Sequence, residues 1–175
     1  MKWIFIVLAA LVLPAGIAFA VGSVVPRQHQ VTRSATYAQD ADAVWKAITS
    51  FREFPTWRSG IDSVRELDSA GHGGWIERSG SDELPLEIVD QEPGTRLMLR
   101  IASSDLPFGG TWTYILEPAG ERTRLTITED GHVDNALFRF MARFVFGYAK
   151  TLEDYLRDLG MKFGEEVTVT ASPGR

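Results

Sequence analysis

The sequence has 175 residues, of which 45% are hydrophobic, and its 18 basic side chains are outnumbered by 23 acidic ones. Length and hydrophobic content predict one globular domain with its own core. The chain has no cysteine, which excludes disulfide frameworks, thiolate metal sites, iron–sulfur clusters and cysteine nucleophiles. The net charge of -5 argues against a nucleic-acid partner, because nucleic-acid binders usually present a basic face.

The first segment of the chain is strongly apolar. Between Lys2 and Arg27 no side chain is ionisable, and a helix of this length, at about 1.5 Å per residue, can cross a hydrocarbon core of about 30 Å. The apolar run that continues to Val25 favours a retained single-pass anchor, whereas the small residues of Ala18–Ala20 fit a signal peptide cleaved near that point. Residues 1–26 are therefore expected to be an anchor or a signal peptide, and the following domain to be exported to the periplasm or secreted.

After Pro26 the composition becomes that of a soluble domain. A strand is expected over Gln30–Ala38, then a short helix capped by Asp40 or Asp42, then a second helical turn over Arg52–Arg58. Short apolar stretches separated by turn residues then predict an antiparallel meander. Its strands are expected at Ile61–Leu67, Gly74–Ser79, Leu84–Asp90, Arg96–Ser103, Thr111–Glu117 and Thr123–Asp130.

A long helix from Asp134 or Asn135 to about Lys162 is expected to cover one face of the sheet. Its apolar side chains recur every three or four residues and form one stripe. The stripe consists of Leu137, Met141, Phe144, Tyr148, Leu152, Tyr155 and Leu159. Arg139 falls on the opposite, charged side of this helix. The tail over residues 165–175 has little to bury, and we expect it to be disordered.

Four stretches follow a known pattern, in which a tryptophan-bearing helix, a Phe-Pro-x-Trp turn and a last hairpin precede a long helix. They are Ala41–Ile48, Phe51–Trp57, Gly110–Pro118 and Thr123–Ile127. The chain thereby resembles the START-like helix-grip superfamily (SRPBCC), and within it the polyketide cyclase/dehydrase and lipid-transfer branch. The resemblance implies an α+β helix-grip fold over residues 27–164, with about seven antiparallel strands wrapped around the C-terminal helix, two short helices after the first strand, and a deep cavity.

Aromatic side chains are the first candidates for a ligand site. Aromatic walls with few polar groups suit a flat or aliphatic hydrophobic ligand, although each ring can equally be ordinary core packing. In a helix-grip fold the elements that line the cavity carry Trp57, Trp75, Trp112, Tyr114, Phe140, Phe144 and Tyr148. Phe146 falls on the charged side of the helix, where a lone exposed ring needs no explanation and a membrane- or partner-facing patch is the alternative.

Glu129 is the weak candidate for acid–base chemistry, because it shares strand parity with Leu125 and Ile127. A carboxylate in an apolar pocket can act as general acid or base in an aldol cyclisation or a dehydration. The remaining charged candidates are expected on the wet face of the sheet. They are Glu77, Arg78, Glu87 and Arg100.

The three histidines give no metal site by spacing. His132 and Asp134 form a pair, but a catalytic zinc normally needs three protein ligands, and we assign the pair to a surface loop. His29 and His72 are expected to be solvated. No phosphate loop, nucleophile elbow or dinucleotide motif is present in the sequence, and we expect no cofactor.

Three functions remain open from the sequence. The first is membrane-associated binding or transport of a lipid, isoprenoid or polyketide-like molecule, with that hydrophobic small molecule and a membrane as partners. The second is a cyclase/dehydratase-type enzyme that uses Glu129. The third is a membrane-tethered protein-interaction domain. We favour the non-catalytic binder, because no acid–base pair stands out by spacing.

Overall fold

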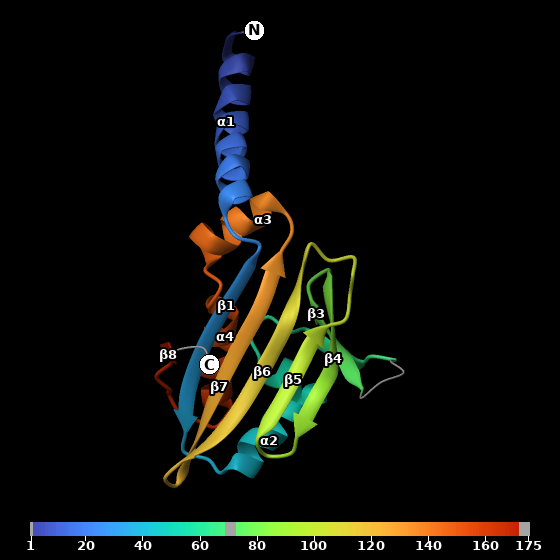
Figure 1. Ribbon diagram of the computed structural model, residues 1–175, viewed down its shortest axis with the longest axis vertical. Helices are drawn as coiled ribbons and strands as arrows, with labels where there is room; N and C mark the ends of the chain where they lie inside the picture. Colours follow the sequence, from blue (N-terminus) through green and yellow to red (C-terminus); the bar gives the residue numbers. More distant parts are fainter. Residues whose placement is uncertain (1, 69–72, 172–175) are drawn as a thin grey trace.

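The computed structural model describes residues 2–68 and 73–171 and shows an α+β architecture (Figure 1). Eight antiparallel strands form one sheet in the order β2-β3-β4-β5-β6-β7-β1-β8. The strands are β1 (Gln28–Tyr37), β2 (Ser63–Glu66), β3 (Gly74–Ser79), β4 (Asp82–Glu92), β5 (Arg96–Ile101), β6 (Phe108–Ala119), β7 (Arg122–Val133) and β8 (Thr170–Ala171). The meander and the fold class predicted from the sequence are confirmed.

The alternation in the strands places one face of the sheet in the core. Leu97 and Leu99 of β5 and Leu125 and Ile127 of β7 are buried, whereas Arg100, between such positions, is exposed. Successive side chains of a strand point to opposite faces, so one face is covered and the other is wet.

The cover comes from α2 (Ala41–Thr49), from the 3-10 turn η1 (Phe51–Thr56) and from α4 (Lys150–Lys162). The Asp40 carboxylate accepts the Ala43 amide at 2.7 Å and begins α2, as predicted. The buried side chains of these elements join those of the sheet in one core. They include Val44, Ile48, Phe54, Leu152, Leu156 and Leu159.

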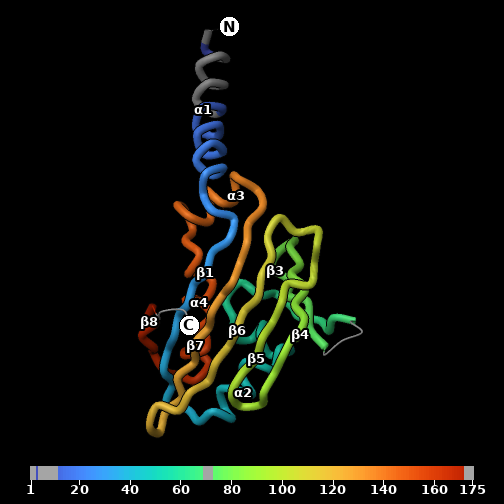
Figure 2. The backbone as a smooth tube through the Cα atoms, viewed as in Figure 1, coloured from blue at the N-terminus to red at the C-terminus, as the bar shows by residue number. Residues whose placement is uncertain are grey.

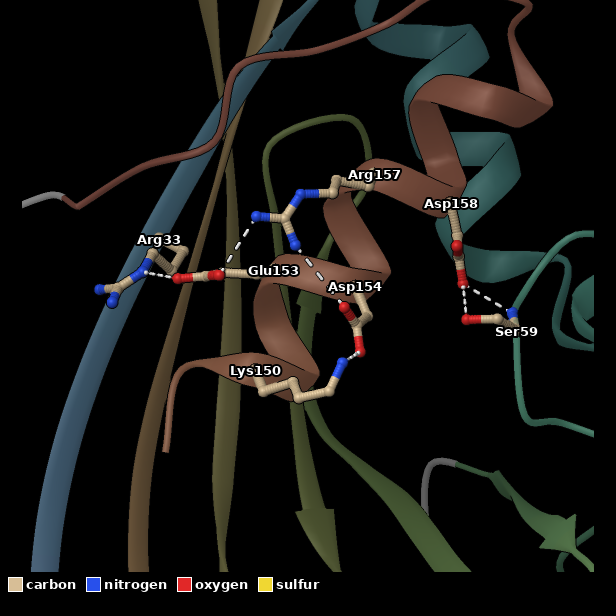
Figure 3. Close-up of polar contacts among 7 residues, drawn as sticks. All are labelled: Arg33, Ser59, Lys150, Glu153, Asp154, Arg157 and Asp158. Atoms are coloured by element: carbon tan, nitrogen blue, oxygen red, sulfur yellow. Dashed lines mark hydrogen bonds and ion pairs between the residues drawn. The ribbon is translucent and has the colours of Figure 1, made fainter. Parts of the chain in front are cut away.

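The polar side of α4 fixes the helix to its neighbours (Figure 3). Arg33 of β1 donates to Glu153 at 2.9 Å, and this hydrogen bond holds the Glu153 pKa below its usual value. Farther along α4, the buried Asp158 carboxylate accepts the backbone amide and the hydroxyl of Ser59 at 2.6 and 2.7 Å. The helix is thus tied to β1 and to the loop after η1.

The prediction of one long C-terminal helix is wrong. Asn135 does cap a helix, but α3 ends at Met141 (Ala136–Met141) and a π-turn, η2 (Ala142–Phe146), follows it. Gly147 then has φ 76° and ψ 133°, outside the helical region, and α4 begins at Lys150. A positive φ suits glycine because it has no Cβ. The apolar stripe is therefore cut, with Leu152 buried in α4 and Phe144 58% exposed in η2.

The tail is ordered farther than predicted. The Glu165 carboxylate accepts the Ala38 amide at 3.0 and 3.1 Å, and β8 extends the sheet by pairing with Arg33 and Ser34 of β1. The expectation of disorder is therefore wrong over residues 165–171, and residues 172–175 lie outside the described residues. The expected domain boundary at residue 164 stays a prediction.

The N-terminal helix α1 (Lys2–Val24) extends away from the sheet, and its base lies beside α3 (Figures 1 and 2). Arg139 joins the two helices, because its guanidinium donates to the carbonyls of Gly22, Val133 and Asp134 at 2.9, 3.1 and 2.7 Å. A cation at the last carbonyls of a helix is favourable. Arg139 is consequently buried, which corrects its assignment to a charged outer side.

The anchor expected over residues 1–26 is not supported by the structure. Within residues 2–68 and 73–171, no helix combines the length and the apolar character that a membrane crossing requires.

Candidate functional site

A cavity of about 390 Å³ lies between the inner face of the sheet and the chain from α3 to the start of α4. It is bordered by the first residues of β1 and β6, the last residues of β7, and single residues of β4 and β5. Phe146 is 62% exposed and lines it, so the cavity reaches the surface there. The lining residues are His29, Leu84, Ile101, Phe108, Gly109, Gly110, Trp112, Glu129, His132, Val133, Phe138, Met141, Ala142, Phe146, Gly147, Tyr148 and Thr151.

Two paired glycines of the sheet lie beside the cavity. Gly110 of β6 pairs with Gly131 of β7, which pairs in turn with His29 of β1. Two adjacent positions of the sheet therefore carry no side chain. The helix that would otherwise lie over them is broken at Gly147, as described above. Gly109 and Gly110 lie within β6, which begins three residues before the strand expected from Thr111.

His29 and Glu129 meet on the wall of the cavity. The two side chains project from neighbouring strands, and Nε2 of His29 lies 3.0 Å from Oε1 of Glu129. The His29 ring also stacks on Tyr148, with ring centroids 4.0 Å apart. The two side chains are only 10% and 18% exposed. The expectation that His29 is solvated is therefore wrong, because β1 begins two residues earlier than predicted and carries it under Tyr148.

Gly131 is required for this arrangement. A Cβ atom added there would lie 2.6 Å from Cε1 of His29 and 3.1 Å from Oε1 of Glu129. Contacts below about 3 Å between such atoms force one of them to move, and overpacking of this kind destabilises the fold. The His29 ring has little room to yield, since Tyr148 stacks on it.

The other end of the same interlayer space is filled. We call it the closed end, defined by Arg58, Glu77, Tyr114 and Tyr155, and we call the end with the cavity the open end. Only about 20 Å³ remains empty at the closed end. Arg58 forms an ion pair with Glu77, and its guanidinium lies 4.9 Å from the centre of the Tyr155 ring. Trp75 donates to the same Glu77 oxygen at 3.0 Å.

Burial dominates the electrostatics of the closed end. Loss of hydration raises the pKa of Tyr114 and of Tyr155 well above the usual value near 10. Burial by itself would lower the pKa of Arg58, but the charge and hydrogen bond of Glu77, together with the nearby Tyr155 and Tyr114, outweigh it, and the pKa is raised. Both tyrosines are therefore neutral and the guanidinium is charged at any physiological pH. Such a neutralised, fully packed group stabilises the fold and leaves no room for a ligand.

The seven predicted aromatic side chains divide between the two ends and the surface. Trp112 and Tyr148 line the cavity, and Tyr114 lines the small space at the closed end. Trp75 is fully buried and stacks on Phe51, and Trp57 packs edge-on against Phe54 and Tyr155, so both belong to the core. Phe140 and Phe144 contact each other, with ring centroids 5.2 Å apart, and neither lines the cavity. That any of them binds a ligand stays a prediction.

The charged candidates also divide. Glu129 lines the cavity, as its strand parity predicts. Glu87 and Arg100 pair with each other at the surface, and Arg78 is exposed. Glu77 is buried at the closed end, which corrects its assignment to the wet face.

The other two histidines are His132, at the cavity, and His72, outside the described residues. His132 is at the end of β7 and lines the cavity with a half-exposed ring, rather than standing in a surface loop. His72 lies outside the described residues. In the part of the chain that the structure describes, no three metal-ligating side chains come together. What the cavity can hold is an apolar molecule, with hydrogen bonding concentrated at Glu129.

Comparison with known proteins gives one family and many similar folds. The family model described as polyketide cyclase/dehydrase and lipid transport matches residues 28–159. No curated protein matches the chain. Among solved structures, a conserved protein from Geobacillus kaustophilus has a TM-score of 0.65 at 16% identity, over 81% of this chain and 99% of that one.

Two further solved structures have the same fold. The Zhui aromatase/cyclase from a Streptomyces species has a TM-score of 0.63 at 13% identity and covers 77% of this chain and 93% of its own. A START superfamily protein from Mycobacterium smegmatis has a TM-score of 0.61 at 16% identity, over 77% and 96%. At these identities the likeness shows the fold alone.

Proposed function

Because the chain belongs to the polyketide cyclase/dehydrase and lipid transport family, we propose that it binds a hydrophobic small molecule, a lipid, isoprenoid or polyketide-like compound, in the cavity at the open end. The observation that carries this proposal is the cavity itself. Its volume of about 390 Å³ falls within the usual range for small-molecule sites, and most of its lining side chains are aliphatic or aromatic. Phe108, Phe138 and Phe146 are exposed at its rim, where an apolar molecule would reach it.

Binding of the neutral fluorophore N-phenyl-1-naphthylamine to the purified full chain tests the proposal. We expect a saturable, one-to-one rise in fluorescence, because the probe leaves water for an apolar wall. Ala142 lines the cavity, and Ala142→Trp should fill part of it and weaken binding at least tenfold. The matched control is Ala171→Trp on the outer strand β8, which should leave binding unchanged. Unsaturable uptake that is equal in all three proteins would contradict the proposal.

The contact between His29 and Glu129 favours a second candidate, a cyclase/dehydratase-type enzyme. A carboxylate hydrogen-bonded to an imidazole on an apolar wall can remove a proton from carbon beside a carbonyl group and return it to a leaving oxygen. With an identified substrate, Glu129→Gln should abolish turnover while the fold is kept. Unchanged turnover would remove Glu129 from the chemistry.

We further propose that the chain acts at a lipid surface, as the apolar N-terminal segment suggested. Phe138, Phe144 and Phe146 are exposed near the base of α1, and groups of exposed apolar side chains are typical of interaction sites. The double substitution F144S/F146S should reduce co-sedimentation with phosphatidylglycerol-containing vesicles. Met161→Ser, at an equally exposed position on α4, is the control. Cleavage near Ala20 stays a prediction that the intact mass of the mature protein decides.

A further inference from the structure

In the described chain, the ionisable side chains that line the cavity include a carboxylate but no lysine or arginine. Among its lining residues, all of which the structure describes, Glu129 is the one carboxylate, and there is no lysine or arginine. The two lining histidines differ, since His29 is engaged with Glu129 whereas His132 is half-exposed near Asp134, 3.9 Å away. A ligand carrying a carboxylate or a phosphate would therefore meet a negative charge and find no cation inside the cavity.

The Glu129 carboxylate keeps hydrogen-bonding capacity for a ligand. Its Oε1 atom pairs with Nε2 of His29, and within residues 2–68 and 73–171 it has no other polar partner. An ionised carboxylate offers about four acceptor positions on two oxygens, and an acceptor in an apolar cavity gains from each one that is filled. Glu129 itself is part of the wall, so what fills those positions is the occupant of the cavity.

The contact to His29 leaves the Glu129 oxygens as acceptors toward the cavity. The Nδ1 atom of His29 is buried and has no hydrogen-bond partner in the described chain. Nε2 of His29 is placed to donate a hydrogen bond to Oε1 of Glu129, whereas Nδ1 faces no acceptor in the described chain. The pair therefore presents the carboxylate oxygens of Glu129 to the cavity as hydrogen-bond acceptors.

We propose that the ligand of this cavity is an apolar molecule with a hydroxyl group, an alcohol or a phenol, that donates its hydrogen bond to Glu129. The proposal rests on the binding function proposed above and names its ligand class. A hydroxyl group brings one donor to one carboxylate. An ammonium group brings three donors and would leave two of them without a charged partner in the apolar part of the cavity. A fatty acid is excluded by the charge of Glu129.

Three probes of one ring system test this ligand class. 2-Naphthol, naphthalene and 2-naphthoate displace N-phenyl-1-naphthylamine from the full chain at pH 7.5, with the Ala142→Trp variant as the background. We expect 2-naphthol to bind about tenfold more tightly than naphthalene, because its hydroxyl donates to a charged acceptor. We expect 2-naphthoate to bind more weakly than naphthalene.

The variant Glu129→Gln assigns the preference to the carboxylate. It keeps the size of the side chain and removes the charge, so the advantage of 2-naphthol over naphthalene should fall to about threefold or less and 2-naphthoate should gain affinity. Glu87→Gln is the matched control, since this glutamate is paired with Arg100 at the surface, and it should leave the ranking unchanged.

The outcomes separate the two proposals. Naphthalene binding as tightly as 2-naphthol, or 2-naphthoate binding most tightly, overturns the ligand class while binding in the cavity stands. An unchanged ranking in a folded Glu129→Gln protein overturns the role of Glu129. If the variant does not fold, the ranking in the unmodified chain still decides the ligand class. If none of the probes displaces the fluorophore, the binding function fails, and the ligand class fails with it.

Discussion

The open end and the closed end lie under the same sheet, and each contains a glutamate paired with a basic side chain. At the closed end Glu77 and Arg58 are enclosed by tryptophan and tyrosine rings, and about 20 Å³ is left empty. At the open end Glu129 and His29 border a cavity of about 390 Å³. The two ends share Trp112 and Thr151 as lining residues, so the filled part supports the wall of the hollow part.

The difference between the two ends shows why one is filled with side chains and the other is hollow. Continuous helix α4 and bulky side chains fill the closed end, where the ion pair is compensated by surrounding donors and rings. At the open end, glycines of β6 and β7 lie beside the cavity and the helix is broken at Gly147. The same fold thus places a filled, stabilising end and a hollow end under one sheet.

The largest effect is expected from Glu77→Gln. It leaves the buried Arg58 guanidinium without a counter-charge, which typically costs about 3–5 kcal/mol of stability. Glu129→Gln, at the edge of the cavity, should cost less than about 1.5 kcal/mol. Urea unfolding of both variants measures this comparison. Equal losses would mean that the two ends do not differ in their share of the stability.

Alkaline pH should act through the buried tyrosines, of which Tyr114 and Tyr155 lie at the closed end and Tyr37 lies elsewhere in the core. The pKa values of Tyr114 and Tyr155 are raised by burial, so the unfolded chain ionises first, and the stability present below about pH 10 is lost as pH rises. The loss is about 1.4 kcal/mol per tyrosine per pH unit. Absorbance of tyrosinate near 295 nm should then appear together with the loss of near-ultraviolet circular dichroism. Ionisation of both tyrosines in a folded protein near pH 10 would contradict their burial.

Gly131→Ala should disturb the open end specifically. The added methyl group presses on the His29 ring, and overpacking costs about 1–3 kcal/mol. The preference for 2-naphthol should decrease as well, because the contact to Glu129 is displaced. Gly109→Ala is the control, since its methyl group would meet His132, a half-exposed ring that can turn away. Equal effects of both substitutions would mean that His29 is not held in place.

The smallest effect is expected from Gly147→Ala. A non-glycine residue at φ 76° costs about 1–2 kcal/mol. Gly60 also has a positive φ but lies away from the cavity, so Gly60→Ala should give a similar loss of stability. Only Gly147→Ala should weaken binding of N-phenyl-1-naphthylamine, because Gly147 shapes the path of Tyr148. Equal affinities in the two variants would mean that the helix break does not shape the cavity.

The sequence predicts the fold well and the site only in part. Strand parity correctly places Glu129 on the inner face, because alternation depends on local geometry. Strand parity does not place His29 at the cavity, because the first two residues of β1 are polar and form a strand only by pairing with β7. It also misses the helix break, because the apolar stripe runs through Gly147 without interruption. The pairing of Gly110 with Gly131 was the available signal of a hollow, and it depends on a register that only the fold supplies.

Native mass spectrometry of the full chain, isolated gently from the cells that produce it, tests the central claim most directly. The account predicts one discrete apolar compound with a hydroxyl group, bound at close to one molecule per chain and absent from the Ala142→Trp variant. A cavity that is empty in every preparation, or that carries the same mixture of compounds in both proteins, would contradict a ligand site at the open end.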